Sequence, residues 1–127
     1  MVSSAWKHIR RTAVAAGAFA AHLLKGLLEE SMLVVFETAA RYQMYHALAL
    51  CIVSWAIVQR PHRGFATPGW LFTAGIGLFC GSLYGLSLSG VRWLGAVTPL
   101  GGTAFIAGWT LLAWRTWQLI RDETARG

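Results

Sequence analysis

The chain has 127 residues, of which 56% are hydrophobic and only 13% are charged. A soluble domain usually carries about 25% charged residues, so this chain lacks the polar surface that a soluble protein of its length needs. The net charge is +6, but the basic residues stand in short clusters between apolar runs. That pattern is typical of membrane proteins. We therefore expect a protein surrounded by the lipid bilayer, with no nucleic-acid partner.

Four apolar stretches predict an all-α integral membrane protein, with four transmembrane helices bundled in a single domain. The predicted spans cover residues 12–28, 42–58, 70–88 and 94–117. The first is the least certain, because its residues rise only about 25 Å against a hydrocarbon core of about 30 Å. The sequence does not determine whether it fully crosses the membrane. Its basic start resembles that of a signal peptide, but the apolar sequence continues and three more spans follow, which favours a signal anchor over a cleaved peptide.

The segment between the first two spans, residues 29–41, has helical periodicity. Apolar residues recur at helical spacing from Met32 to Ala39, while Glu37 and Arg41 fall on other faces. This predicts an amphipathic helix at the membrane surface that continues straight into the second span. Residues 59–69 contain two Pro and two Gly and predict a loop.

The distribution of Lys and Arg predicts the orientation of the four spans. One side of the predicted bundle holds eight basic residues and the other side holds three. The eight are Lys7, Arg10, Arg11, Arg60, Arg63, Arg115, Arg121 and Arg126, and the three are Lys25, Arg41 and Arg92. The side with eight is expected to be cytoplasmic. Both termini would then lie in the cytoplasm.

The order of the spans brings polar residues from all four helices into the outer half of the membrane. Ionisable residues inside a span are costly and usually face the bundle interior, so His22 and His46 are the centre of a candidate pocket. Its predicted members are His22, Tyr42, Gln43, His46, Ser82, Tyr84 and Thr98. Such a pocket suits a lipid, a quinone or haem. The alternative is that each histidine is a neutral, hydrogen-bonded contact between helices.

Glycines within the spans predict close packing of helices or an oligomer face. The predicted packing glycines are Gly77, Gly81, Gly85, Gly101 and Gly102. Pro99 removes a backbone donor just before the last two, which predicts a kink or a short re-entrant start to the fourth helix. Cys51 and Cys80 lie in apolar runs and are interpreted as small buried hydrophobes.

Five motifs follow one another along the chain. They are Gly17-Ala-Phe-Ala-Ala-His22, Tyr42-Gln43 with His46-Ala47, Gly81-Ser-Leu-Tyr84, Thr98-Pro-Leu-Gly-Gly102, and Gly108-Trp109. In this order they resemble the family catalogued as domain of unknown function 423. The resemblance implies a small multi-pass protein of the bacterial inner membrane and supplies no activity. This chain departs from the family at Ala20, where glycine is usual, and in a first span that is shorter and follows a basic cluster.

The sequence contains no nucleophile–base pair, zinc-protease motif, phosphate-binding loop or paired intramembrane carboxylates. We therefore expect no enzymatic activity, no cofactor and no metal. Small size, glycine-lined helices and a marginal first span favour an accessory or structural subunit of a larger membrane complex, or a homo-oligomer. The alternative is a membrane binding or transport protein that uses the polar pocket.

Overall fold

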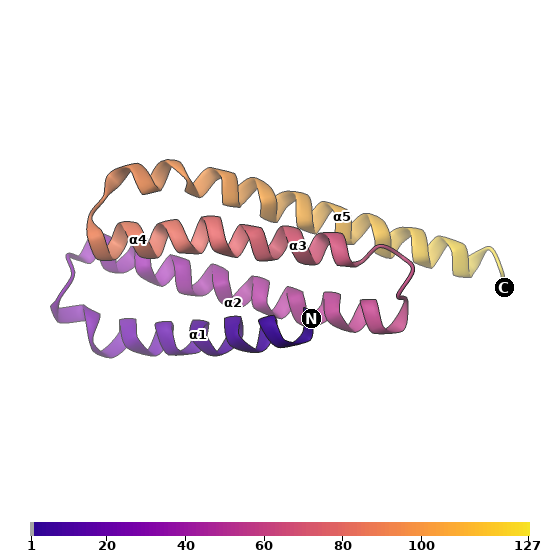
Figure 1. The fold of residues 1–127 in the computed structure, drawn as a ribbon, viewed down its shortest axis with the longest axis horizontal. Helices are drawn as coiled ribbons and strands as arrows, with labels where there is room; N and C mark the ends of the chain where they lie inside the picture. Colours follow the sequence, from indigo (N-terminus) through magenta and orange to yellow (C-terminus); the bar gives the residue numbers. More distant parts are fainter. Residues whose placement is uncertain (1) are drawn as a thin grey trace.

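The computed structural model describes residues 2–127, with the side chains of residues 8–19 and 22–127. Long helices run back and forth along one axis (Figure 1). The helices are α1 (Val2–His22), α2 (Glu30–Gln59), α3 (Ala66–Gly75), α4 (Gly81–Ser89) and α5 (Thr98–Thr124). Shorter turns are η1 (Leu24–Gly26), the π-helical η2 (Ile76–Cys80) and η3 (Arg92–Ala96). Because η2 joins α3 directly to α4, these three elements form one uninterrupted helix.

Within the described part of the chain, two helical segments are long and apolar enough to cross a membrane, Ala66–Ser89 and Arg92–Thr124. They correspond to the third and fourth predicted spans. The helix α2 is longer, but Gln43 and His46 interrupt its apolar half, and its first twelve residues include the charged Glu30, Glu37 and Arg41. The all-helical fold is as predicted, whereas the arrangement of four complete spans remains a prediction.

The predicted interfacial helix and the second span form one continuous helix, α2. The reason is that residues 30–59 contain neither glycine nor proline, so nothing breaks the helix before Arg60 and Pro61. Phe36, Ala39 and Ala40 in its first half are buried against neighbouring helices. The apolar face of this segment is therefore covered by protein.

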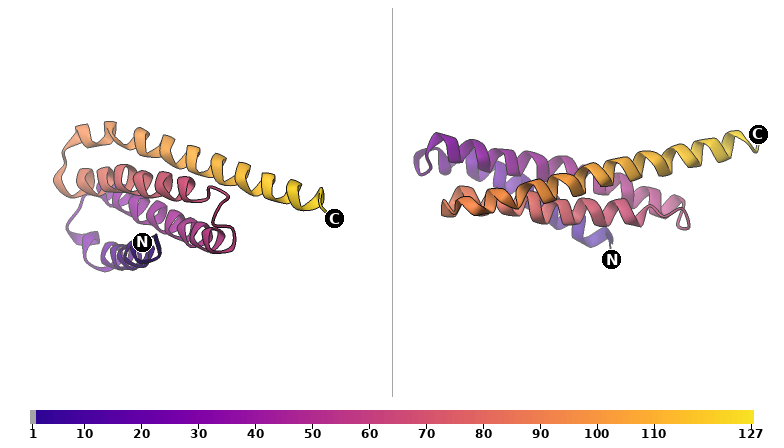
Figure 2. Two further views of the ribbon diagram at one scale, coloured as in Figure 1. Left: turned by 45° about the vertical axis from the view of Figure 1, so that its right-hand side comes forward. Right: turned by 90° about the horizontal axis from the view of Figure 1, so that it is seen from above.

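The helix α1 packs along the first part of α2, on the opposite side of the bundle from α5 (Figures 1 and 2). Ile9 and Thr12 lie beside Gln43, and the rings of Phe19 and Phe36 are 6.4 Å apart. At 1.5 Å per residue α1 is about 31 Å long and α2 about 45 Å. The antiparallel hairpin therefore places the start of α1 beside the middle of α2.

This register of α1 changes the predicted grouping of basic residues. Arg10 and Arg11 follow Ile9, which contacts Gln43, so they lie beside the middle of α2. They do not lie at the end of the bundle that holds Arg60 and Arg63. The prediction that all eight basic residues share one side rested on a first span of full length, and α1 does not extend that far along α2.

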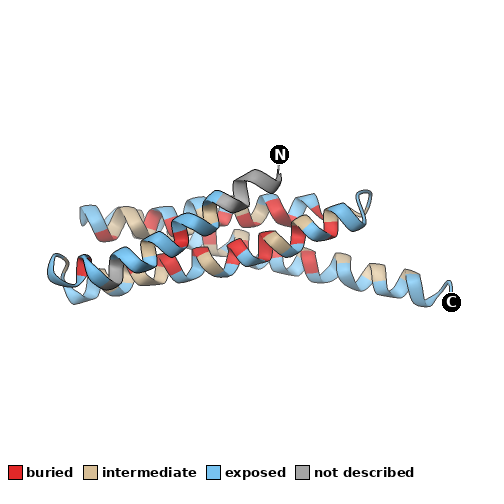
Figure 3. Cartoon of the chain, turned by 90° about the horizontal axis from the view of Figure 1, so that it is seen from below, coloured by how far each residue is buried: buried red, intermediate tan, exposed pale blue. Residues whose placement is uncertain are grey.

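The core lies where α2, the α3–α4 helix and α5 meet. Phe72 and Val53 have no exposed surface, and Phe105 is 4% exposed. Buried residues line the inner faces of the helices, whereas the last turns of α5 extend past the bundle and are mainly exposed (Figure 3). The buried Cys80 and half-buried Cys51 are free thiols.

Close contacts between helices depend on glycines that only partly match the prediction. A Cβ atom on Gly101 would lie 2.3 Å from the backbone nitrogen of Phe79, and one on Gly85 would lie 2.9 Å from Leu94. Gly101 therefore allows α5 to touch the backbone of η2. Gly77 and Gly81 face open space, so they do not contribute to packing within this chain.

Pro99 lies in the first turn of α5 and produces no kink there. Proline is well tolerated at this position because the first amides of a helix have no intrahelical acceptor. The predicted irregularity is confined to the short η3 turn that precedes α5.

Candidate functional site

A buried glutamine joins three helices. Gln43, which is 6% exposed, donates through Nε2 to the carbonyl oxygen of Ile9 at 2.9 Å and to Oγ1 of Thr12 at 2.7 Å. Its Oε1 accepts a hydrogen bond from the Tyr84 hydroxyl at 2.8 Å. The amide thus uses both of its donors and its acceptor. This set of contacts connects α1, α2 and α4.

His46 lies one turn further along α2 and is fully engaged. Its Nδ1 is 2.8 Å from the carbonyl oxygen of Tyr42, so Nδ1 carries the proton and donates. Its Nε2 then accepts a hydrogen bond from Nε1 of Trp109 at 3.2 Å. The ring also stacks on Phe105, with centroids 3.5 Å apart. In this arrangement neither ring nitrogen is free to bind an iron or another metal.

The two predicted histidines are not brought together. His22 is exposed at the end of α1, whereas His46 is buried in the middle of the bundle. Ile9 contacts Gln43, and His22 lies thirteen residues further along α1, or about 20 Å. That displacement points away from His46. A haem held between these two histidines does not fit the structure.

The remaining predicted residues form a separate contact. Ser82 and Thr98 share a hydrogen bond of 2.8 Å between their hydroxyls, which joins α4 to the start of α5. Ser82 also donates to the carbonyl oxygen of Phe79. Six of the seven predicted pocket residues therefore lie in one stretch of the bundle, but they make three sets of contacts and no single polar pocket.

An aromatic cleft opens beside His46. It has a volume of about 600 Å³. Its lining residues are Tyr42, Tyr45, His46, Phe79, Gly102, Phe105, Ile106 and Trp109. Tyr42 lies against Phe79 with ring centroids 4.7 Å apart, and Trp109 lies against Phe72 at 5.0 Å. The cleft is mainly apolar, and its chemistry suits a flat or branched hydrophobic molecule.

Comparison with known protein families identifies the family of this chain. Residues 16–102 match the model of a family described as "Protein of unknown function (DUF423)". The chain belongs to the DUF423 family. The matched residues include Gln43, His46, Tyr84 and the start of α5.

Relatives that resemble this chain are named as membrane proteins. The UPF0382 membrane protein YwdK of Bacillus subtilis is 48% identical over 101 residues, covering 79% of this chain and 82% of the relative. A UPF0382 membrane protein of Staphylococcus haemolyticus is 44% identical over 107 residues, covering 84% and 87%. One of Staphylococcus aureus is 47% identical over 100 residues, covering 79% and 81%. No solved structure matches the chain.

These relatives and the two apolar helical segments support a membrane location for this DUF423 protein. Sequence reasoning found Gln43, His46 and Tyr84 but missed their partners Thr12 and Trp109. Thr12 is exposed and follows a basic cluster, and nothing in its neighbourhood predicts a hydrogen bond to Gln43. The sequence feature that could have identified Trp109 is its place in an ordered motif with Gly108. A tryptophan inside a span is, however, usually interpreted as a packing residue.

Proposed function

We propose that this protein is a non-catalytic accessory or structural subunit of a larger assembly in the bacterial inner membrane. The observation that carries the proposal is the register of α1. It puts an exposed cationic residue, Arg11, at the level of Gln43 and Tyr84, where the Ala66–Ser89 helix carries no charged residue.

The depth of Arg11 follows from its chain neighbour Thr12 and two hydrogen bonds. Arg11 precedes Thr12, Thr12 accepts from Gln43, and Gln43 accepts from Tyr84. Tyr84 belongs to Ala66–Ser89, a segment without any charged residue, and lies about 8 Å from its end. A guanidinium at this level is costly in lipid. A protein partner with acidic or polar groups at that depth would stabilise it.

The polar groups of the interior support a structural role. Gln43 uses both of its donors and its amide oxygen in three hydrogen bonds, and both nitrogens of His46 are engaged. A general base or nucleophile needs a free lone pair near open space. Because these groups are committed to neighbouring helices, they stabilise the bundle.

We expect a multi-pass topology in which the 60–65 loop and the C-terminus face the cytoplasm. Five basic residues lie at that end of α2 to α5, and three lie toward the other end. The five are Arg60, Arg63, Arg115, Arg121 and Arg126, and the three are Lys25, Arg41 and Arg92. The excess favours the cytoplasmic side. The N-terminus is expected there only if residues before Ile9 continue across the membrane.

The experiment is purification of the full chain from its native membrane in a mild detergent, followed by native mass spectrometry. We expect a stoichiometric protein partner in the wild type. Arg11→Glu should release that partner, because it reverses the charge at the proposed contact. Arg126→Glu, with the same charge change at the exposed end of the chain, should retain it.

A wild-type protein that runs as a monomer with no stoichiometric partner would contradict the proposal. So would a partner that survives Arg11→Glu and Arg126→Glu equally well. Circular dichroism of both variants checks that each retains the helical fold.

A second candidate function rests on the aromatic cleft between Tyr42, Phe105 and Trp109. A cleft of about 600 Å³ lined by rings suits the head or tail of an isoprenoid, such as a quinone, or a lipid chain. Binding there would make the protein a carrier or a receptor. The engagement of His46 with Trp109 favours these apolar ligands over haem.

Organic extraction of the purified protein followed by mass spectrometry tests this candidate. We expect a defined hydrophobic molecule in the wild type and its loss in Tyr45→Ala, because Tyr45 lines the cleft and is 53% exposed. Trp93→Ala, a change of an exposed aromatic outside the cleft, should retain it. Equal retention by both variants would place the molecule elsewhere.

A further inference from the structure

A basic cavity lies where the loop between α2 and α3 meets the last turns of α5. Its volume is about 410 Å³. Its lining residues are His62, Arg63, Gly64, Arg115, Gln118, Arg121 and Asp122. None of them belongs to the clusters around Gln43 and His46 or to the aromatic cleft.

Arg115 lies against the loop with unused donors. Gly64 has φ of +71°, and a Cβ atom there would lie 3.3 Å from the guanidinium carbon of Arg115. Glycine thus lets the loop turn tightly and lie against the guanidinium. The Nε of Arg115 is buried without a hydrogen-bond partner among the described residues, and Nη1 has only a long contact of 3.4 Å to Gln118. A guanidinium carries five N–H donors, so this one lacks acceptors.

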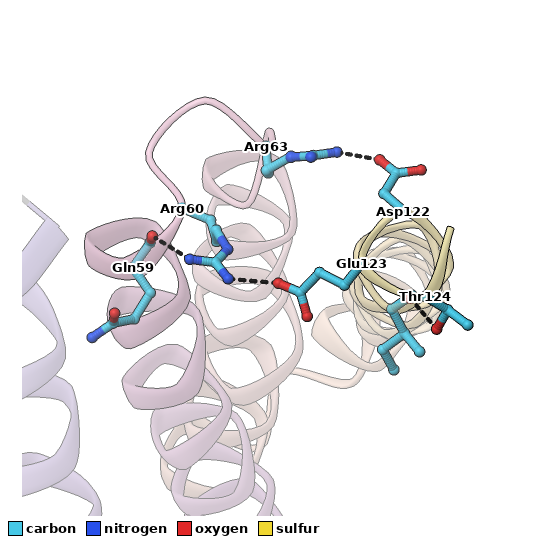
Figure 4. Close-up of polar contacts among 7 residues, drawn as sticks. Gln59, Arg60, Arg63, Asp122, Glu123 and Thr124 are labelled. Atoms are coloured by element: carbon cyan, nitrogen blue, oxygen red, sulfur yellow. Dashed lines mark hydrogen bonds and ion pairs between the residues drawn. The ribbon is translucent and has the colours of Figure 1, made fainter. Parts of the chain in front are cut away.

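The cavity has an excess of positive charge. Three arginines and one aspartate line it, which leaves +2 when His62 is neutral. Arg63 pairs with Asp122 at 2.5 Å (Figure 4). Arg121 lies over the ring of Trp117 at 4.9 Å, and this uncharged partner leaves the excess of positive charge unchanged. The neighbouring pair of Arg60 and Glu123, at 2.6 Å, adds no net charge (Figure 4).

The pKa of the Asp122 carboxyl group is lowered by the same positive charges. The hydrogen bond from Arg63 holds the pKa of Asp122 below its ordinary value, and the charges of Arg63, Arg121 and Arg126 lower it further. An anion that entered the cavity would meet the same attraction.

The cavity also lies at a level suited to lipid headgroups. Trp114 and Trp117 are exposed on the same turns of α5, and exposed tryptophans at the end of an apolar helix mark the membrane interface. Basic pockets between helices at this level bind the phosphates of anionic lipids.

We propose that this cavity binds a phosphate group, with the Arg115 guanidinium as its central donor and Arg121 as a second cation. Arginine suits phosphate because its planar donors meet two oxygens at once. The phosphate can belong to an anionic phospholipid headgroup or to a soluble molecule. A phosphate site at this end of the bundle is independent of whether the protein joins a larger assembly.

The test uses the full chain, delipidated in a neutral detergent, and native mass spectrometry to measure bound lipid. The probes are phosphatidylglycerol and a diacylglycerol with the same chains, which differ by the phosphoglycerol headgroup, and inorganic phosphate. We expect phosphatidylglycerol to bind and diacylglycerol not to bind. Arg115→Gln should weaken phosphatidylglycerol binding about tenfold or more, as expected for a lost charge-assisted contact.

Two further variants keep the test decisive. Arg121→Gln changes an exposed lining residue, so it should fold normally and still weaken binding. Arg126→Gln removes the same charge from the same end of the chain outside the cavity and should bind like the wild type.

Inorganic phosphate separates the two sources. If inorganic phosphate displaces phosphatidylglycerol at millimolar concentration, the site takes a soluble phosphate. The same follows if inorganic phosphate binds to the protein and phosphatidylglycerol does not. If phosphatidylglycerol stays bound, the site takes a lipid headgroup. Equal binding of the two lipids with no binding of phosphate would overturn the proposal, as would full binding in both Arg115→Gln and Arg121→Gln.

Discussion

Replacing Gln43 by leucine should loosen α1 more than any other part of the protein. The change keeps a similar volume but removes the hydrogen bonds to Ile9 and Thr12, which hold α1, and the one from Tyr84. Hydrogen bonds between helices in membrane proteins contribute about 0.6 kcal/mol each, so three contribute about 2 kcal/mol. The Tyr84 hydroxyl is left unpaired, which adds about 1 kcal/mol. The expected loss of stability is about 3 kcal/mol.

The assay is a denaturing-detergent titration followed by circular dichroism, combined with hydrogen–deuterium exchange. Exchange should rise in peptides from residues 8–19, because their anchor to α2 is lost, and should stay low in α5. Tyr84→Phe, which removes only one of the three hydrogen bonds, should cost about 1 kcal/mol. The double variant should cost less than the sum of the two, because it leaves no unpaired tyrosine hydroxyl.

Two results together would refute the reasoning. The free energy of unfolding of Gln43→Leu would lie within about 0.5 kcal/mol of the wild-type value, which is the range of most surface substitutions. The amides of α1 would also remain protected from hydrogen exchange. Raised exchange throughout the protein would show instead that α1 unfolds together with the bundle.

Three further results follow from the structure. Gly101→Ala should destabilise the protein by about 1–3 kcal/mol, because its Cβ would lie 2.3 Å from a backbone nitrogen of η2; Gly77→Ala, which faces open space, should be neutral in the same denaturation assay. The ion pair of Asp122 and Arg63 should form at neutral pH and be lost on acidification, because a lowered pKa keeps the carboxylate ionised in the folded protein until the pH falls through that pKa. The NMR chemical shifts of the loop should change with this transition in the wild type. The same change should be absent in Asp122→Asn. Ser54→Ala should leave the melting temperature unchanged or raise it, since the buried hydroxyl has no hydrogen-bond partner among the described residues.

Local pattern was enough to identify the helices and the polar residues inside them. The uncharged run from Ala66 to Ser89 is long and apolar enough to cross a membrane, and this follows from its length and composition without reference to its neighbours. Gln43, His46 and Tyr84 stood out for a similar reason, since a polar group inside an apolar run needs a partner. The sequence also predicted that Ser82 and Thr98 lie at the same depth, because successive spans reverse direction.

The identity of each partner depended on how far the helices slide and rotate against one another. Thr12 meets Gln43 because α1 pairs with the first part of α2, and the same register separates His22 from His46. Nothing within α1 fixes that offset, since an apolar face packs equally well at several positions along a neighbouring helix.

The sequence by itself therefore determined that the chain is helical, apolar enough for a membrane, and polar at a few interior positions. The tertiary structure decided that His46 accepts a hydrogen bond from Trp109 and that Gly101, not Gly77, lies at a close contact between helices. It also decided that Arg115 lines a cavity. The physical reason is the range of the forces involved. Helix formation and transfer into lipid depend on neighbours along the chain, whereas hydrogen bonds and close packing need atoms from separate helices to meet within a few tenths of an ångström.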